Sequence, residues 1–180
     1  MKFCAHCGSP VERLVPAGDN RLRHVCPACG CIHYQNPRLV VGTLPVWGDQ
    51  VLLCRRAIEP RHGYWTLPAG FMENGESAAD GALRETMEEA CARVRLIAPY
   101  TLVSVPHIDQ IHLLFRAELA DLEFAPGTES LEVRLFAEQE IPWKELAFSS
   151  VSLTLQTFFE ERRHGQFGVH HFSLDALPRS

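Results

Sequence analysis

The stretch Gly70–Ala92, GFMENGESAADGALRETMEEACA, decides the fold of this 180-residue chain. It contains five glutamates: Glu73, Glu76, Glu85, Glu88 and Glu89. The last three are spaced i, i+3 and i+4, so a helix brings them side by side. A separate stripe with helical spacing is predicted to face a core, and it consists of Ala79, Leu83, Thr86 and Ala90. We therefore predict a helix with one buried face and one carboxylate face.

Three neighbouring carboxylates repel one another and destabilise a helix unless something neutralises them. Arg84 is the one nearby cation in this stretch. A hard divalent cation with oxygen ligands, Mg²⁺ or Mn²⁺, neutralises such a cluster directly. The alternative is a solvated acidic face without a metal.

The residues before the helix favour a ligand site. Gly70 and Gly75 allow tight turns and close approach of the backbone to a ligand. Ser77 is the predicted N-cap, with Asp80 three residues later in an imperfect capping box. A loop that enters a helix N-terminus in this way suits an anionic ligand such as a phosphate.

This segment resembles the Nudix box, G-x5-E-x7-R-E-U-x-E-E-x-G-U, in which U is an apolar residue. Six residues match at the family's spacing: Gly70, Glu76, Arg84, Glu85, Glu88 and Glu89. The chain departs from the pattern at Cys91, which replaces the glycine that normally ends the helix, and at the apolar positions Thr86 and Ala92. The resemblance implies an α+β fold, the Nudix α/β/α sandwich with a mixed sheet, over about residues 38 to 163.

The resemblance also implies roles for the matching residues. Glu85, Glu88 and Glu89 would be the ligands of Mg²⁺ or Mn²⁺, with the Gly70 carbonyl as a possible further ligand. Glu76 and Arg84 would support them, and all five charged box residues would belong to the catalytic site.

The general base is open between a box glutamate and a later one. Glu132, just before a predicted strand, occupies a place where related enzymes supply a distal glutamate, and Glu129 is the second candidate. An ordinary charge at a strand edge is the alternative for Glu132.

The N-terminal residues carry two Cys-x2-Cys pairs. Cys4, Cys7, Cys26 and Cys29 have the spacing of a tetrahedral structural zinc site in a zinc ribbon. The alternatives are a redox pair or a degenerate site. His6, Cys31 and His33 are close enough in sequence to serve as substitute ligands. We predict a ribbon at residues 1–36, a Nudix domain at 37–163 and a C-terminal tail at 164–180, which is either loose or docked on a partner.

Strands are predicted at 39–47, 51–56, 65–67, 93–105, 110–119 and 131–136, and a second helix at 149–163. Arg55 and Arg56 end the second strand, and either could bind substrate phosphate or be a surface charge. Trp65 could stack on a base, although core packing is the better interpretation.

Composition sets limits on function. The chain has no apolar run long enough to span a membrane and no signal-peptide core at its start, so a soluble cytoplasmic protein is expected. A net charge of −5 argues against broad nucleic-acid binding. Seven cysteines, an odd number, do not suggest a secreted disulfide framework.

A zinc ribbon ahead of a Nudix domain also resembles the NADH-pyrophosphatase branch and its ADP-ribose pyrophosphatase-like relatives. That branch usually carries SQPWPFPxS after the box, whereas Ser104–Gln110 reads SVPHIDQ, which argues against NADH as the main substrate. The resemblance implies hydrolysis of the diphosphate of ADP-ribose, FAD, NADH or a similar compound, with release of a nucleoside monophosphate, by a homodimer. Removal of a nucleotide cap from RNA is a related possibility. The alternative class is a non-catalytic nucleotide sensor or zinc-ribbon adaptor.

Overall fold

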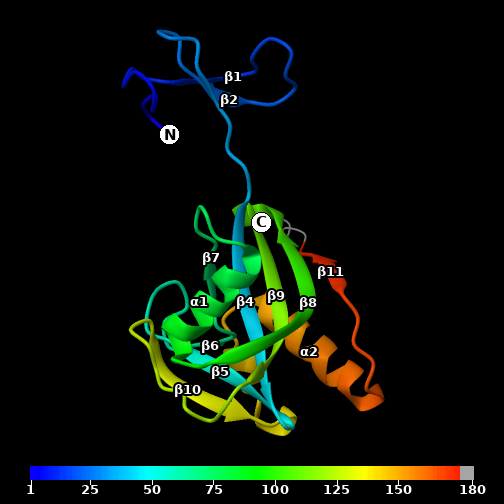
Figure 1. Ribbon diagram of the computed structural model, residues 1–180. Coiled ribbons are helices and arrows are strands. Elements are labelled where there is room, and N and C mark those ends of the chain that lie inside the picture. Colours follow the sequence, from blue (N-terminus) through cyan, green and yellow to red (C-terminus); the bar gives the residue numbers. More distant parts are fainter. Residues whose placement is uncertain (175–180) are drawn as a thin grey trace. The chain divides into compact units, whose positions relative to one another are not determined.

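The computed structural model describes residues 1–174 (Figure 1). The chain forms two compact units, Met1–Pro37 and Arg38–Ser180. None of the helices in the described residues has the length and apolar character that a bilayer crossing requires.

The first unit is a small antiparallel sheet with two cysteine-bearing turns. Its strands are β1 (Glu12–Leu14), β2 (Arg23–Val25) and β3 (Ile32–His33). Cys4, Pro16 and Cys26 are its only buried residues. So small a core cannot stabilise a domain by apolar burial alone, which agrees with the predicted ribbon.

The second unit is built on one mixed sheet with the strand order β10-β5-β4-β9-β8-β11. The strands are β4 (Arg38–Trp47), β5 (Gln50–Arg56), β8 (Val94–Val105), β9 (Gln110–Leu119), β10 (Ser130–Phe136) and β11 (His170–Ser173). Strands β4 and β9 are parallel, as are β8 and β11, whereas the other neighbours are antiparallel. The parallel pair β4–β9 makes the centre of the sheet from segments far apart in sequence.

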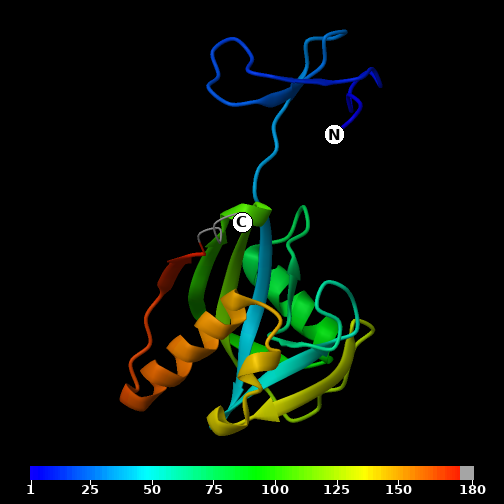
Figure 2. The same cartoon turned by 180° about the vertical axis from the view of Figure 1, so that it is seen from behind.

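Two helices cover opposite faces of this sheet, α1 (Ala78–Ala90) and α2 (Ser149–His164) (Figures 1 and 2). Side chains along β4 point alternately to the two faces of the sheet, so the strand packs against both helices. Val41 packs with Ala82 of α1, and Leu44 packs with Leu155 of α2. Trp65 is also in the core, edge-on to Phe136 at 4.8 Å between ring centroids. The predicted α/β/α sandwich is confirmed.

The sheet opens between β4 and β5. The two strands pair only next to their two-residue turn, at Val46–Val51 and Trp47–Gln50, and then diverge (Figures 1 and 2). Beyond that point β7 (Ala69–Phe71) pairs with β4 and β6 (Trp65–Thr66) pairs with β5. The box loop therefore enters the sheet where the strands separate.

Most predicted elements lie within a residue or two of the observed ones, and the main differences are short. Strand β7 was expected to be loop, and β11 falls in the segment expected to be a loose or partner-docked tail. Residues 175–180 of that tail lie outside the described residues. Three short 3-10 helices complete the unit: η1 (Pro106–Ile108), η2 (Glu138–Glu140) and η3 (Trp143–Glu145).

Candidate active site and metal centres

A cavity of about 590 Å³ lies in the second unit, where the sheet opens. One wall carries carboxylates from α1 and from the loop before β10. The opposite wall comes from β9 and the start of α2. Its lining includes Arg56, Gly70, Phe71, Glu85, Glu88, Glu89, Gln110, His112, Glu129, Phe148 and Ser150. The box glutamates thus border a space large enough for a small-molecule ligand.

Helix α1 is oriented differently from the prediction. Thr86 and Ala90 of the expected apolar stripe are buried, but Leu83 of that stripe is exposed. Glu85 and Glu89, expected on the carboxylate face, are buried. The expected separation into a buried face and a carboxylate face is therefore wrong. The physical reason is that the cavity lies under this helix, so part of its inward face borders open space instead of packed apolar core.

The two ends of α1 are fixed locally. The backbone N–H of Asp80 donates to the Ser77 hydroxyl at 3.1 Å, and the Ser77 N–H donates back to the Asp80 carboxylate at 3.3 Å, so the capping box is complete. At the other end Cys91 adopts the left-handed conformation, φ 47° and ψ 28°, that the family's glycine would provide. The two departures at apolar positions are both buried: Thr86, whose hydroxyl is bonded to the Ala82 carbonyl at 2.7 Å, and Ala92.

Arg84 connects the box loop to the helix. Its guanidinium donates two bonds to Glu76, at 2.8 and 3.0 Å, and one each to Glu85 at 2.7 Å and Glu88 at 3.0 Å. It also donates to the Phe71 carbonyl at 3.2 Å. Hydrogen bonds from Arg84 lower the pKa of Glu76 to about 2, so this pair is ionised at neutral pH.

Glu85 lies against the backbone of Gly70. A β-carbon at position 70 would lie 2.3 Å from the Glu85 carboxylate oxygen Oε2, far inside contact distance. Only glycine therefore leaves room for the carboxylate in this position. Burial raises the pKa of Glu85, and the hydrogen bond from Arg84 opposes that rise.

Glu89 is the most buried of the three helix glutamates, at 6% exposure. The Ala69 N–H donates to its Oε2 at 3.2 Å. Burial raises the pKa of Glu89 to about 8, and this backbone hydrogen bond only partly offsets it. Glu88, by contrast, has 58% of its side chain exposed.

The chemistry of this donor set fits a hard divalent cation. All donors are oxygens, and the buried Glu89 carboxylate has no adjacent basic side chain hydrogen-bonded to it among residues 1–174. The ligand atoms of Glu85, Glu88 and Glu89 do not all lie within 4.8 Å of one another in this part of the chain. Arg84 holds Glu85 and Glu88 while the Ala69 backbone holds Glu89, so the carboxylates are oriented by different partners.

Of the two later glutamates, the structure brings Glu129 to the cavity and not Glu132. Glu132 lies on β10, where its carboxylate is 3.8 Å from Arg55 and nearly half exposed. Glu129 lines the cavity because the loop before it packs on the end of α1, where the Gly127 N–H donates to the Glu89 carbonyl at 3.0 Å. A β-carbon at Gly127 would lie 1.7 Å from the Glu88 carbonyl oxygen, so this approach requires glycine.

Of the two arginines at the end of β5, one lines the cavity and the other does not. Arg56 is buried, lines the cavity and places its guanidinium 5.2 Å from the centre of the Phe148 ring. Arg55 does not line the cavity and bonds the Gly63 carbonyl at 2.9 Å. Successive strand residues point to opposite faces, so only one of the pair can face a ligand.

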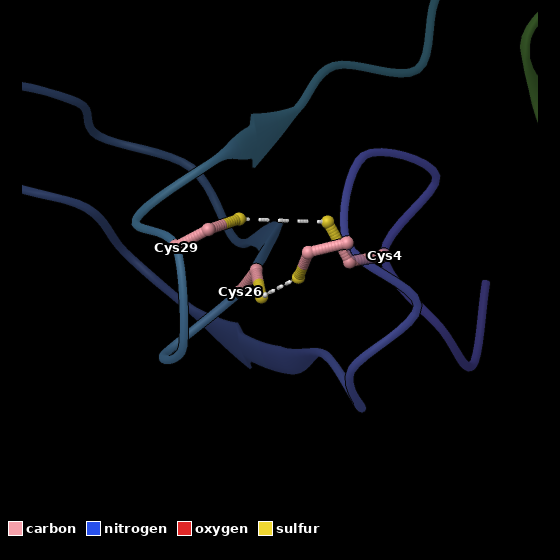
Figure 3. A group of neighbouring side chains, drawn as sticks. Cys4, Cys26 and Cys29 are labelled. Atoms are coloured by element: carbon pink, nitrogen blue, oxygen red, sulfur yellow. Dashed lines mark hydrogen bonds between the residues drawn. The ribbon is translucent and has the colours of Figure 1, made fainter.

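The first unit contains the second candidate metal centre. Cys4 and Cys29 have their sulfur atoms 3.7 Å apart (Figure 3). The sulfur atoms of Cys7 and Cys26 are 3.5 Å apart. All four lie within 4.8 Å of one another. Tetrahedral zinc with Zn–S bonds of about 2.3 Å places its sulfurs about 3.8 Å apart, so the four thiols fit this ion.

Two of the suggested substitute ligands are also close. Cys31 and His33 form a second group with Cys4, and the His33 Nε2 atom is 3.2 Å from the Cys4 sulfur. A ring nitrogen at this distance can donate to a thiolate, and such an outer hydrogen bond would orient a metal ligand. His6 contributes its backbone N–H to the same sulfur at 3.4 Å.

Family models match both units. The model described as "Nudix N-terminal" matches residues 2–35, and the model described as "NUDIX domain" matches residues 36–155. The chain belongs to the Nudix family. Five of the six residues that match the Nudix box border the cavity, and these are Gly70, Arg84, Glu85, Glu88 and Glu89. The thiol cluster lies within the residues matched by the N-terminal model.

Solved structures agree with this assignment. The Nudix chain is similar to a NUDIX hydrolase from Nitrosomonas europaea, with 55% identity and a TM-score of 0.94 over 97% of this chain and 99% of that one. An ADP-ribose pyrophosphatase from Streptococcus suis shares the fold at 20% identity, with a TM-score of 0.62 over 77% of this chain and all of that one.

Curated relatives carry a more specific name. The NAD-capped RNA hydrolase NudC of Stutzerimonas stutzeri is 35% identical over 148 residues, which are 78% of this chain and 50% of that protein. NudC of Pseudomonas aeruginosa is 32% identical over 73% of this chain and 45% of its own length. The Nudix chain therefore spans about half the length of the curated relatives it matches.

Sequence reasoning did not find the far wall of the cavity. Gln110 and His112 belong to a predicted strand and Ser150 to a predicted helix, all three without a role, and Phe148 lies just before that helix with no assignment. Because residues two apart in a strand point to the same face, the sequence places Gln110 and His112 on one side of β9. No sequence pattern indicates that α2 begins beside them.

Proposed function

We propose that this Nudix protein hydrolyses the diphosphate bridge of a nucleoside diphosphate linked to another group and releases a nucleoside monophosphate. ADP-ribose, FAD, NADH and similar compounds belong to this class. The observation that carries the proposal is the carboxylate wall of α1 bordering a cavity of about 590 Å³ together with the Gly70 loop.

In this proposal Glu85, Glu88 and Glu89 hold Mg²⁺ or Mn²⁺, with the Gly70 carbonyl as a further ligand. When bound, the cation would neutralise phosphate charge and lower the pKa of a water molecule. Glu76 and Arg84 keep the box loop on the helix, so that the carboxylates stay oriented toward the substrate.

The remaining roles fall to residues on other elements. We assign the general base to Glu129, which lines the cavity, with a box glutamate as the other candidate. Glu132 is the first candidate from sequence, and we prefer Glu129 because Glu132 is not among the residues that line the cavity and its carboxylate on β10 is 3.8 Å from Arg55 on β5. Arg56 is the phosphate-binding arginine, since its guanidinium lines the same cavity.

The zinc site is proposed to be structural. Cys4, Cys7, Cys26 and Cys29 would saturate one Zn²⁺ and leave no coordination position open to a substrate. The metal would then supply the stability that the small core of the first unit lacks.

The substrate proposal extends to capped RNA, because the curated relatives are named NAD-capped RNA hydrolases. We also propose a cytoplasmic homodimer, which size-exclusion chromatography with light scattering would test. A non-catalytic nucleotide sensor is the alternative function, and it would not need a complete set of oriented carboxylates.

The test is release of AMP from ADP-ribose, FAD, NADH and NAD-capped RNA by the full-length protein with Mg²⁺ or Mn²⁺. Glu88→Gln should lower kcat by at least about 100-fold, because it removes a charged cation ligand while the exposed side chain contributes little to folding. A near-normal rate in this variant would contradict the assigned metal site. AMP binding without turnover of any of these substrates would favour the sensor.

A further inference from the structure

The cavity wall opposite the glutamates carries a chain of three polar side chains that the proposed chemistry does not use. Oε1 of Gln110 is 3.0 Å from Nε2 of His112, and Nδ1 of His112 is 2.9 Å from the hydroxyl of Ser150. Gln110 and His112 are two residues apart on β9 and face the same side. Ser150 lies in the first turn of α2 and is 2% exposed. A strand and a helix thus hold the three groups together.

The chemistry of the groups fixes the direction of these hydrogen bonds. An amide oxygen can only accept, so the His112 Nε2–H donates to Gln110. Nδ1 of the neutral imidazole is then an acceptor, and the Ser150 hydroxyl donates to it. Burial lowers the pKa of His112, which agrees with a neutral ring.

This arrangement leaves the amide nitrogen of Gln110 as the free end of the chain. Its oxygen is engaged by His112, and no hydrogen bond to its nitrogen is made by residues 1–174. The neighbouring lining residues Val40, Ile108 and Leu114 are apolar. Donors placed in an apolar wall favour a ligand with an acceptor at that point, because an apolar ligand would leave the donors unpaired.

The same wall offers a surface for a flat ring. Phe148 lines the cavity, and one face of its ring is covered by the Arg56 guanidinium. Nucleobases stack on aromatic side chains irrespective of sequence, whereas a directed hydrogen bond discriminates among them. The wall therefore combines a stacking surface with a fixed pair of N–H donors.

We propose that Gln110 recognises the nucleobase of the substrate by donating from its amide nitrogen to an acceptor on the ring. His112 and Ser150 are positioning residues that fix the orientation of the amide. The proposal rests on the hydrolysis proposed above, since it places the nucleoside end of that substrate opposite the carboxylate wall. It names a specificity-determining residue outside the Nudix box.

The experiment measures binding of AMP and of ribose 5-phosphate to the full-length protein by titration calorimetry with Mg²⁺ present. Ribose 5-phosphate keeps the phosphate and sugar but has no base. Gln110→Ala should weaken AMP binding about tenfold and leave ribose 5-phosphate binding unchanged, since one hydrogen bond is typically worth about a factor of ten. Ser150→Ala should weaken AMP binding by a smaller factor. Ser152→Ala is the matched control on the same helix, because Ser152 does not line the cavity and its hydroxyl bonds only a backbone carbonyl, so this variant should bind both ligands normally.

Turnover of ADP-ribose provides a second readout. Gln110→Ala and Ser150→Ala should raise KM and leave kcat nearly unchanged, because a base contact is the same in the ground state and the transition state. Unchanged AMP affinity in Gln110→Ala would overturn the proposal, as would an equal loss of AMP and ribose 5-phosphate. If Gln110→Ala weakens AMP binding but not ribose 5-phosphate binding, and the wild type hydrolyses no diphosphate, base recognition by Gln110 is supported and the proposed hydrolysis is contradicted.

Discussion

Gly70 and Glu85 are in direct contact, with the glycine backbone filling the space next to the carboxylate. A β-carbon on residue 70 would lie 2.3 Å from Oε2 and 2.5 Å from Oε1 of Glu85. The carboxylate is the end of a flexible side chain, so an added methyl group would displace it without disturbing the core. The box glycine therefore positions a proposed metal ligand, in addition to allowing the loop to turn.

Gly70→Ala should consequently affect activity more than stability. The displaced Glu85 would lose its 2.7 Å contact with Arg84 and its orientation toward the cavity. We expect an activity loss of about 10- to 100-fold, as is typical when the support of a metal ligand is removed. The melting temperature should change by only a few degrees, since glycine-to-alanine changes at permitted backbone angles alter stability by about 1 kcal/mol or less. Steady-state kinetics and thermal melting measure the two effects.

Gly168→Ala is the control for this prediction. A β-carbon at that position would have its nearest neighbours at 3.5 Å, an ordinary contact, so activity should remain normal. Full activity in Gly70→Ala would show that the Glu85 carboxylate is not required in the observed position.

The ion pair between Glu76 and Arg84 should appear in the pH dependence of stability. Arg84 lowers the pKa of Glu76 to about 2 from an ordinary value near 4.5, so the folded state favours the ionised carboxylate. The stabilisation is fully present above pH 4.5 and is lost as the pH falls toward 2. The difference in unfolding free energy between the wild type and Glu76→Gln should therefore be largest at neutral pH and shrink between pH 4.5 and 3.

Urea unfolding followed by tryptophan fluorescence measures this difference. Trp47, Trp65 and Trp143 are the three tryptophans of the chain, and all lie in the second unit with Glu76. Glu145→Gln is the control, since Glu145 is exposed and has no ion-pair partner among the described residues. A difference that grows on acidification would contradict the assigned pairing.

Zinc removal should unfold the first unit and leave the second unit folded. Cys26→Ser is expected to abolish stoichiometric zinc, because it removes a buried thiol from the four-cysteine group. The tryptophan-detected melting curve should stay within a few degrees of the wild type, since all the tryptophans lie in the other unit. Elemental analysis and fluorescence measure the two outcomes.

Cys31→Ser distinguishes the two possible ligand groups. Cys31 belongs only to the group with Cys4 and His33, so this variant should retain about one zinc per chain. If Cys31→Ser loses zinc while Cys29→Ser keeps it, the metal is bound by Cys4, Cys31 and His33 instead.

The features predicted correctly from sequence are those encoded by short-range patterns. The helix that carries Glu85, Glu88 and Glu89, its Ser77 cap and each Cys-x2-Cys pair depend on neighbours within a few residues. The burial of Glu85 could not be predicted in this way. A carboxylate is normally expected in solvent, and it is the opening between β4 and β5 that leaves a cavity beneath the helix for this side chain to border.

Longer-range packing accounts for the other differences. The choice between Glu129 and Glu132 depends on how the Gly127 loop packs against the last turn of α1, which no periodicity in the loop indicates. Strand β11 has only four residues and owes its position to parallel pairing with β8, more than sixty residues earlier. Such pairings are decided by the assembled sheet and not by the segment itself.

The end of α1 provides a stability prediction. Cys91 is exposed and adopts φ 47°, a left-handed conformation that costs an ordinary L-residue about 1–2 kcal/mol. Glycine removes this cost but adds about 0.4–1 kcal/mol of chain entropy to the unfolded state. Cys91→Gly should therefore stabilise the second unit by about 0.5–1 kcal/mol and raise its melting temperature by about 1–4 °C. Cys91→Ala, which removes the thiol but keeps the strained conformation, should give no increase, and an equal rise in both variants would show that the thiol, not the backbone, limits stability.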